Sequence, residues 1–119
     1  MDKFEIQRRA MKIAFDVIKF TKMFPASQES KVISYQVIKS STSTASNYQS
    51  AGRGKSMKDF IAKLGIAEEE CDETLFWLEL IEEAKLADPL AIQPFKKESS
   101  EILAIIVASI KTAKLNLSK

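Results

Sequence analysis

Apolar side chains recur every three or four residues along most of the chain, which is the spacing of one face of an α-helix. Four stretches show this pattern, at about residues 2–23, 29–51, 57–86 and 100–115. Proline and glycine favour turns over continued helix, and they separate the first three stretches at Pro25 and at Gly52 and Gly54. The pattern predicts an all-α protein, in which short turns join four helices into an antiparallel up-and-down four-helix bundle.

The first predicted helix carries two neighbouring apolar stripes, more than one partner helix would cover. One stripe consists of Ile6, Ala10, Ile13, Val17 and Phe20, and the other of Phe4, Met11, Phe15 and Ile18. The last helix is also densely apolar between Ile102 and Ile110. We expect this excess to leave an exposed apolar patch, which predicts self-association into a homo-oligomer.

The second predicted helix contains a run of serine and threonine, broken by a single alanine, from Ser40 to Ser46. These residues are mediocre helix formers, so propensity alone would end the helix here. Because no glycine or proline interrupts the run, we expect the helix to continue. The small side chains would then let a partner helix approach closely, with large residues opposite filling the space.

Local signals predict the turns. Ser27 or Ser30 can cap the second helix and Ser56 the third, while the glycines of residues 51–56 would supply positive φ at a helix end. Gly65 lies inside the third helix, where we expect a close helix crossing. Residues 87–97 hold two prolines and are expected to form a loop that folds back through Leu90, Ile92 and Phe95.

Composition narrows the class of protein. A chain of 119 residues with 45% hydrophobic content predicts one folded domain, residues 1–119. No apolar run is long enough to span a bilayer, and the first ten residues lack an apolar signal core, so we expect no membrane contact and a cytoplasmic location. A lone Cys71 and the absence of histidine exclude most zinc and di-iron arrangements, and we expect no metal and no cofactor.

The formal net charge of +2 hides an uneven distribution along the chain. Residues 1–58 hold eleven basic and four acidic side chains, residues 59–88 hold two and ten, and residues 89–119 hold five and two. The blocks are either solvated faces that attract one another within the bundle, or a basic surface for nucleic acid beside an acidic third helix.

The basic side chains that we consider candidates for nucleic-acid binding are Arg53, Lys55, Lys58, Lys39, Arg8, Arg9 and Lys12. Arg53, Lys55 and Lys58 form the densest cluster, at a helix junction with free backbone N–H groups. No aromatic side chains are interleaved with them for base stacking, so the predicted binding depends little on base sequence.

Catalytic motifs fit the chain poorly. The segment Gly54-Lys55-Ser56 resembles the end of a phosphate-binding Walker loop, but Gln49 stands where the first glycine belongs and no strand is predicted before it. The carboxylates of Glu69, Glu70 and Glu73 could bind Mg²⁺ only weakly and fit a solvated face better. We therefore expect a protein that is not an enzyme.

A turn centred near Gly54 would place Lys39 and Ser40 opposite residues 68–70. This register predicts an ion pair from Lys39 to Glu70 or Glu73. We extend it to a candidate structural polar network of Gln36, Ser43, Asn47, Glu70 and Glu73. Cys71 falls on the apolar stripe and is expected in the core, while Trp77 flanks that stripe as either a core residue or an interface anchor.

Several short motifs, in order, resemble one family. They are Tyr35-Gln36, Lys39-Ser40, Ser43, Asn47-Tyr48, Ala51, Ser56, Asp59-Phe60, Lys63-Leu64, Ile66-Ala67, Glu70, Glu73-Thr74, Trp77-Leu78 and Ile110 to Lys114. Together they resemble the bacterial four-helix bundle proteins that are encoded in intervening sequences of 23S ribosomal RNA genes. The chain departs from that pattern at Lys39, Ser46, Ser50 and Glu69, where the family usually has Arg, Ala, Glu and Lys.

The resemblance implies a bundle that assembles into a ring-shaped homo-oligomer, typically a pentamer, without known catalytic activity. A relative of this family, the accessory variability determinant protein of diversity-generating retroelements, is a basic pentamer that binds nucleic acid. The chain is thus expected to be an oligomeric accessory protein that binds RNA or DNA. The alternative is a protein-interaction scaffold that binds a protein partner and no nucleic acid.

Overall fold

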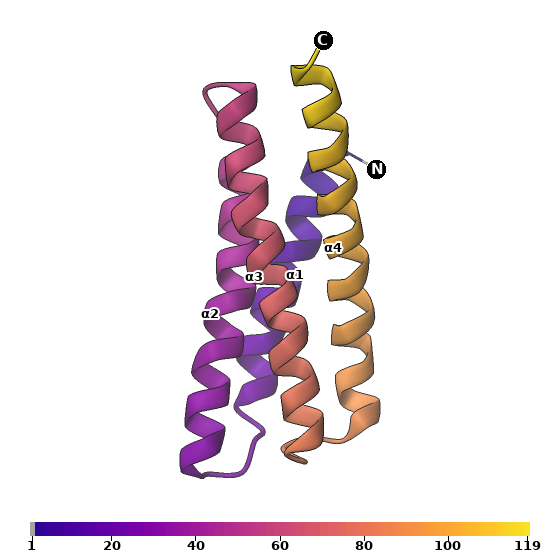
Figure 1. The fold of residues 1–119 in the computed structure, drawn as a ribbon. Coiled ribbons are helices and arrows are strands. Elements are labelled where there is room, and N and C mark those ends of the chain that lie inside the picture. Colours follow the sequence, from indigo (N-terminus) through magenta and orange to yellow (C-terminus); the bar gives the residue numbers. More distant parts are fainter. Residues whose placement is uncertain (1) are drawn as a thin grey trace.

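The computed structural model describes residues 2–119, so Met1, part of the predicted domain, lies outside the described residues. Figure 1 shows long helices side by side, joined at alternating ends. They are α1 (Lys3–Thr21), α2 (Gln28–Ala51), α3 (Met57–Glu83) and α4 (Pro89–Leu117), and the described residues contain no strand. This confirms the predicted antiparallel four-helix bundle, a rod of 52 × 22 × 20 Å.

Each helix packs against two neighbours. Helix α1 contacts α2 and α4, and α3 contacts the same two helices. Within residues 2–119 no Cα atoms of α1 and α3 lie within 8 Å of each other, so these two helices lie diagonally across the bundle. Their outer surfaces therefore face opposite sides of the molecule.

The first three helices begin at side-chain caps. The Oγ atoms of Ser27 and Ser56 accept hydrogen bonds from the N–H groups of Ser30 and Asp59, each at 3.1 Å. These bonds satisfy backbone donors that have no partner inside the helix. Of the two predicted candidates for α2, Ser27 is the cap, and the prediction for Ser56 is confirmed.

Helix α2 runs unbroken through the serine and threonine run, as predicted. The hydroxyl groups bond to carbonyl oxygens of the preceding turn, for example from Thr44 to Ser40 at 2.8 Å, so they do not compete with the helix. The prediction of large residues opposite is correct only in part. Ile13 and Ile102 face this segment, but so do the small side chains of Ala10, Cys71 and Ser99.

The prediction of a loop at residues 87–97 is wrong, because α4 already begins at Pro89. Asp88 caps it by accepting the Leu90 N–H at 2.8 Å, and proline is well suited to the first helical position. Pro94 lies near the start of the helix, so its missing N–H leaves only the carbonyl of exposed Leu90 without a helical donor. Ile92 and Phe95 do pack onto the bundle, whereas Leu90 is 82% exposed and does not.

Helix α3 ends at Glu83, slightly before the predicted residue 86. Lys85 has a positive φ of 56°, the Lys85 N–H bonds to the Glu82 carbonyl, and the Leu86 N–H bonds to the Ile81 carbonyl. This hydrogen-bond pattern is the Schellman motif. It buries Leu86 and turns the chain towards α4.

The predicted role of the glycines is wrong, since none of the three has a positive φ. Gly54 is required for another reason. A Cβ there would lie 2.9 Å from Asp59 Oδ2 and 3.1 Å from the Ala51 carbonyl oxygen. Gly65 is not at a close crossing either, because a Cβ there would have no neighbour within 4 Å.

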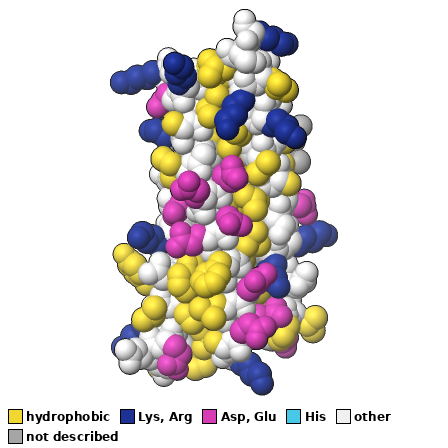
Figure 2. All heavy atoms as spheres, viewed as in Figure 1, with side chains coloured by type: hydrophobic (Ala, Val, Ile, Leu, Met, Phe, Trp, Pro, Cys, Tyr) yellow, Lys and Arg dark blue, Asp and Glu magenta, His cyan; other side chains and the backbone are white. Residues whose placement is uncertain are grey.

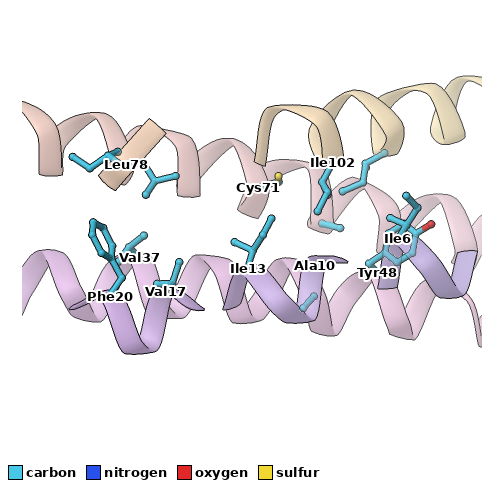
Figure 3. Close-up of a cluster of buried hydrophobic side chains, with 14 of the residues drawn as sticks. Ile6, Ala10, Ile13, Val17, Phe20, Val37, Tyr48, Cys71, Leu78 and Ile102 are labelled. Atoms are coloured by element: carbon cyan, nitrogen blue, oxygen red, sulfur yellow. The ribbon is translucent and has the colours of Figure 1, made fainter. Parts of the chain in front are cut away.

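The core extends along the whole rod (Figure 3). From one end to the other, it includes Phe20, Val17, Val37 and Leu78, then Ile13, Cys71 and Ile102, then Ile6 and Tyr48. The first stripe of α1 is buried here, as its spacing predicts. The second stripe, Phe4, Met11, Phe15 and Ile18, is 37–58% exposed, and we call it the α1 outer stripe.

We expect Gly65→Ala to raise the free energy of unfolding by about 0.5–1 kcal/mol, because alanine favours the helix and its methyl group meets open space. The matched substitution Gly54→Ala should lower it, because its methyl group would lie 3.1 Å from the Ala51 carbonyl oxygen, closer than an ordinary van der Waals contact. Chemical denaturation followed by circular dichroism measures both. A loss of stability in Gly65→Ala would contradict this account of α3.

Candidate nucleic-acid interface

One end of the bundle gathers basic side chains from separate parts of the chain. The start of α1, the α2–α3 turn with the start of α3, and the end of α4 lie together there (Figure 1), and Lys and Arg side chains cluster at the same end in Figure 2. The basic residues of these segments are Lys3, Arg53, Lys55, Lys58, Lys63, Lys111, Lys114 and Lys119. The acidic side chains of the same segments are Asp2, Glu5 and Asp59. We call this surface the basic end.

A groove opens beside the basic end, between α1, α2 and the α2–α3 turn. It has a volume of about 740 Å³. Its lining consists of Met11, Ala14, Thr42, Ala45, Ser46, Gln49, Ser50, Arg53, Lys55, Asp59 and Lys63. Three cations and one carboxylate thus meet neutral hydrogen-bonding groups and a few apolar side chains.

The cations of the groove lack ion-pair partners in the described part of the chain, where no salt bridge involves Arg53, Lys55 or Lys63. The carboxylate of Asp59 instead accepts the backbone N–H of Lys55 at 3.3 Å, which holds the turn. Lys63 Nζ donates to Ser50 Oγ at 3.3 Å, a neutral partner that leaves the positive charge of Lys63 uncompensated. These side chains are therefore available to an anion.

Sequence reasoning did not single out Lys63, Lys111 or Lys114 as site residues. Lys63 lies in the acidic third helix, and the two lysines of α4 are more than fifty residues from Arg53 in sequence. The predicted topology was the signal that could have identified the lysines of α4, because an up-and-down bundle returns the end of α4 to the α2–α3 turn.

The second predicted cluster, Arg8, Arg9 and Lys12, is divided by the fold. Arg9 Nε donates to Glu98 Oε2 at 2.7 Å, and Arg9 Nη2 contacts Glu98 and, at 3.1 Å, Glu101. Arg9 therefore joins α1 to α4. Lys12 pairs with Asp16 at 2.7 Å, while Arg8 is exposed on the outer surface of α1.

Lys39 does not form the predicted ion pair, since no salt bridge joins it to Glu70 or Glu73 in the described part of the chain. Ser40 contacts Thr74 at 2.8 Å instead, one helical turn beyond Glu70. The predicted register assumed that α3 begins level with the end of α2 along the bundle axis. The turn in fact carries the chain further along that axis before α3 begins. Each α2 residue therefore lies beside an α3 residue that comes later in the sequence than predicted.

The candidate polar network forms only within single helices. Asn47 Nδ2 donates to the Ser43 carbonyl at 2.9 Å and to Ser43 Oγ at 3.1 Å, both in α2. In α3, Trp77 Nε1 donates to Glu73 Oε1 at 3.4 Å, and the Glu70 backbone carbonyl accepts from Thr74. Gln36 is half-buried and joins neither helix to the other.

Cys71 lies in the core, as predicted, with 2% of its surface exposed. Burial, with a smaller contribution from the nearby charge of Asp72, raises the pKa of its thiol to about 12. The thiol therefore stays protonated near neutral pH, and its Sγ lies 3.4 Å from the Ser99 carbonyl oxygen. These properties fit a packing residue better than a nucleophile.

An apolar patch lies on α3, diagonally opposite α1. Phe76 is 55% exposed and packs edge to face on half-buried Trp77, with ring centroids 4.9 Å apart, and Ile66 is exposed three turns earlier. Acidic side chains border these residues, at Glu69, Asp72, Glu73 and Glu79. Figure 2 shows the acidic band and the hydrophobic side chains beside it. We call this surface the α3 outer patch.

Within residues 2–119 no group of three acidic or cysteine side chains is arranged to hold a metal ion. In that same part of the chain, no helix combines the length and apolar character that crossing a membrane requires. The candidate site is therefore described by charge and hydrogen-bonding groups alone.

We expect the contact between Arg9 and Glu98 to make stability depend on pH. Its hydrogen bonds lower the pKa of Glu98 below the ordinary value of 4.5. A lowered native pKa stabilises the fold above the unfolded pKa, and this contribution is lost as the pH falls through the native value.

Glu98→Gln should therefore lower the free energy of unfolding at pH 7 by roughly 1 kcal/mol. The difference from the wild type should shrink as the pH falls below 4.5. Glu101→Gln is the matched control, because the Glu101 side chain is 50% exposed and should contribute less. Denaturation curves over this pH range measure the effect, and a difference that does not change with pH would contradict it.

Two of three comparisons with known proteins found similar ones. A model of the 23S rRNA-intervening sequence protein family matches residues 2–108. A solved structure, of a protein of unknown function from the S23 ribosomal protein family of Bacteroides thetaiotaomicron, superimposes with a TM-score of 0.83. It is 29% identical, and the match covers 93% of this chain and 99% of that one. A search of curated proteins found no match. The family match spans nearly the whole four-helix bundle, and the chain belongs to the 23S rRNA-intervening sequence protein family.

Proposed function

We propose that this protein is a non-enzymatic, oligomeric accessory protein that binds RNA or DNA through its basic end. The observation that carries this proposal is the cluster of cations without carboxylate partners around Arg53, Lys55 and Lys63. Lysine and arginine neutralise phosphates and release counterions, which requires no base-specific motif. Binding is therefore strong at low salt and weakly dependent on base sequence.

The proposed oligomer is a ring by analogy with the family, and two complementary surfaces of each copy support the contacts between copies. The α1 outer stripe is apolar and lies among Arg8 and Lys19, whereas the α3 outer patch is apolar with an acidic border. Contact between two different surfaces is heterologous, and it closes into a ring when the rotation between copies allows. Cyclic symmetry places every basic end on one rim, so the phosphate contacts multiply.

Charge reversal tests the nucleic-acid surface. We expect Arg53→Glu, Lys55→Glu and Lys58→Glu together to abolish retention of labelled RNA and DNA on a filter at physiological salt. The wild-type affinity should fall steeply with salt, with three phosphate contacts contributing about 2 to 3 to the logarithmic slope. Unchanged retention in the triple variant would remove the proposed surface.

The matched control for that triple variant carries the same charge change at the opposite end of the bundle. Lys31→Glu, Lys85→Glu and Lys97→Glu alter three exposed lysines there. We expect this control to bind nearly as well as the wild type. Equal loss in both triple variants would indicate an effect of net charge without a defined site.

Light scattering after size exclusion tests the ring. We expect a wild-type mass of several copies, five by analogy with the family, and a smaller mass for Phe15→Glu, which places a charge in the α1 outer stripe. Leu90→Glu is the control, because Leu90 is 82% exposed and lies outside both surfaces. A wild-type monomer at micromolar concentration would exclude the ring.

The α3 outer patch also supports the alternative, a scaffold for a protein partner. A basic segment of another protein would complement its acidic border, and its arginine side chains could stack on Phe76 and Trp77. Under this alternative the wild type binds no nucleic acid, and Phe76→Glu releases the partner.

A further inference from the structure

The groove beside the basic end is hollow because its floor is made of small side chains. Ala14 of α1 and Ala45 of α2 are buried beneath it, and Thr42 and Ser46 of the serine and threonine run form its α2 wall. Larger side chains at these positions would fill the space. The volume of about 740 Å³ falls within the range of ordinary ligand pockets.

The chemistry of the lining changes in a fixed order along α2. Arg53 and Lys55 lie at the turn, Gln49 and Ser46 follow, and Thr42 lies at the far end with Met11 of α1. The helical rise between residues 42 and 53 gives this series a length of roughly 16 Å. A nucleotide has the same order of chemistry, with a charged phosphate, a polar sugar and a flat, largely apolar base.

The neutral side chains of the groove have unused hydrogen-bond donors and acceptors. The side chains of Gln49 and Ser46 make no hydrogen bond among the described residues, and Thr42 uses its hydroxyl proton on the Ile38 carbonyl while its lone pairs stay open. An amide and two hydroxyls can bind sugar hydroxyls and base edges.

We propose that this groove binds one nucleotide of a single-stranded nucleic acid. Its phosphate lies among Arg53, Lys55 and Lys63, and its sugar and base lie along Gln49, Ser46 and Thr42. A paired base cannot enter, because stacking and pairing hold it inside the duplex, whereas an unpaired base can leave the stack. The inference rests on the proposed function and adds a preference for single strands that the basic end alone does not give.

Filling the groove without changing its charge tests the inference. We expect Ser46→Leu to weaken binding of a labelled single-stranded oligonucleotide about tenfold, through lost contacts of the base and sugar. Its affinity for the duplex of the same sequence should not change, since a duplex contacts only the basic end. The control is Ser100→Leu on α4, an exposed serine outside the groove, which should change neither affinity.

A second variant tests whether Ser46→Leu weakens binding by disturbing the fold. Gln49→Ala leaves the groove open and removes only the amide, so it too should reduce affinity for the single strand selectively. Thermal melts and light scattering should show that both variants keep the fold and the mass of the wild type. RNA and DNA single strands are measured in parallel, and tighter binding of RNA would assign contacts to the 2′-hydroxyl group.

The outcomes separate this inference from the proposed function. If the wild type binds neither strands nor duplexes, the proposed function fails, and the groove inference fails with it. If the wild type binds both and neither Ser46→Leu nor Gln49→Ala alters the ratio of the two affinities, the groove inference is overturned. The basic end would then remain the binding surface.

Discussion

Close packing of α2 through small side chains is the constraint on which the rest of the structure depends. Serine, threonine and alanine between residues 40 and 46 let α2 approach its neighbours, and the bond between Ser40 and Thr74 fixes its height against α3. A shift of register would break this bond between the helices and leave each buried hydroxyl with only the carbonyl partner in its own helix. That height determines which residues of the α2–α3 turn meet Lys63.

The same small side chains shape the surface. Inside the bundle they meet Ala10, Cys71 and Ser99 in a layer to which all four helices contribute. On the outer surface of α2 they leave the groove that Arg53 and Lys55 border. One stretch of sequence thus serves packing on one side and a candidate binding surface on the other, because a helix presents neighbouring residues to different surroundings.

The positions of the charged side chains do not follow from which helices are neighbours. In the described part of the chain no salt bridge joins an acidic residue of α3 to a basic residue of α2, although these helices are neighbours. They border the α3 outer patch, while the cations of three segments meet at the basic end. Arg9 shows the limit of counting charges along a sequence. It belongs to a basic cluster in the chain, yet its guanidinium group joins α1 to α4 through Glu98.

The sequence by itself determined the four helices, the buried stripes and the cap at Ser56, because these depend on residues within one or two turns of each other. The loop predicted before α4 was wrong, since Pro89 suits the first helical position and Pro94 follows it too closely to end the helix. Only the tertiary structure decided the register of α2 on α3, the partners of Arg9 and the placement of Lys63 in the same groove as Arg53. Each depends on how far a turn carries the chain along the bundle axis, a distance that no local pattern records.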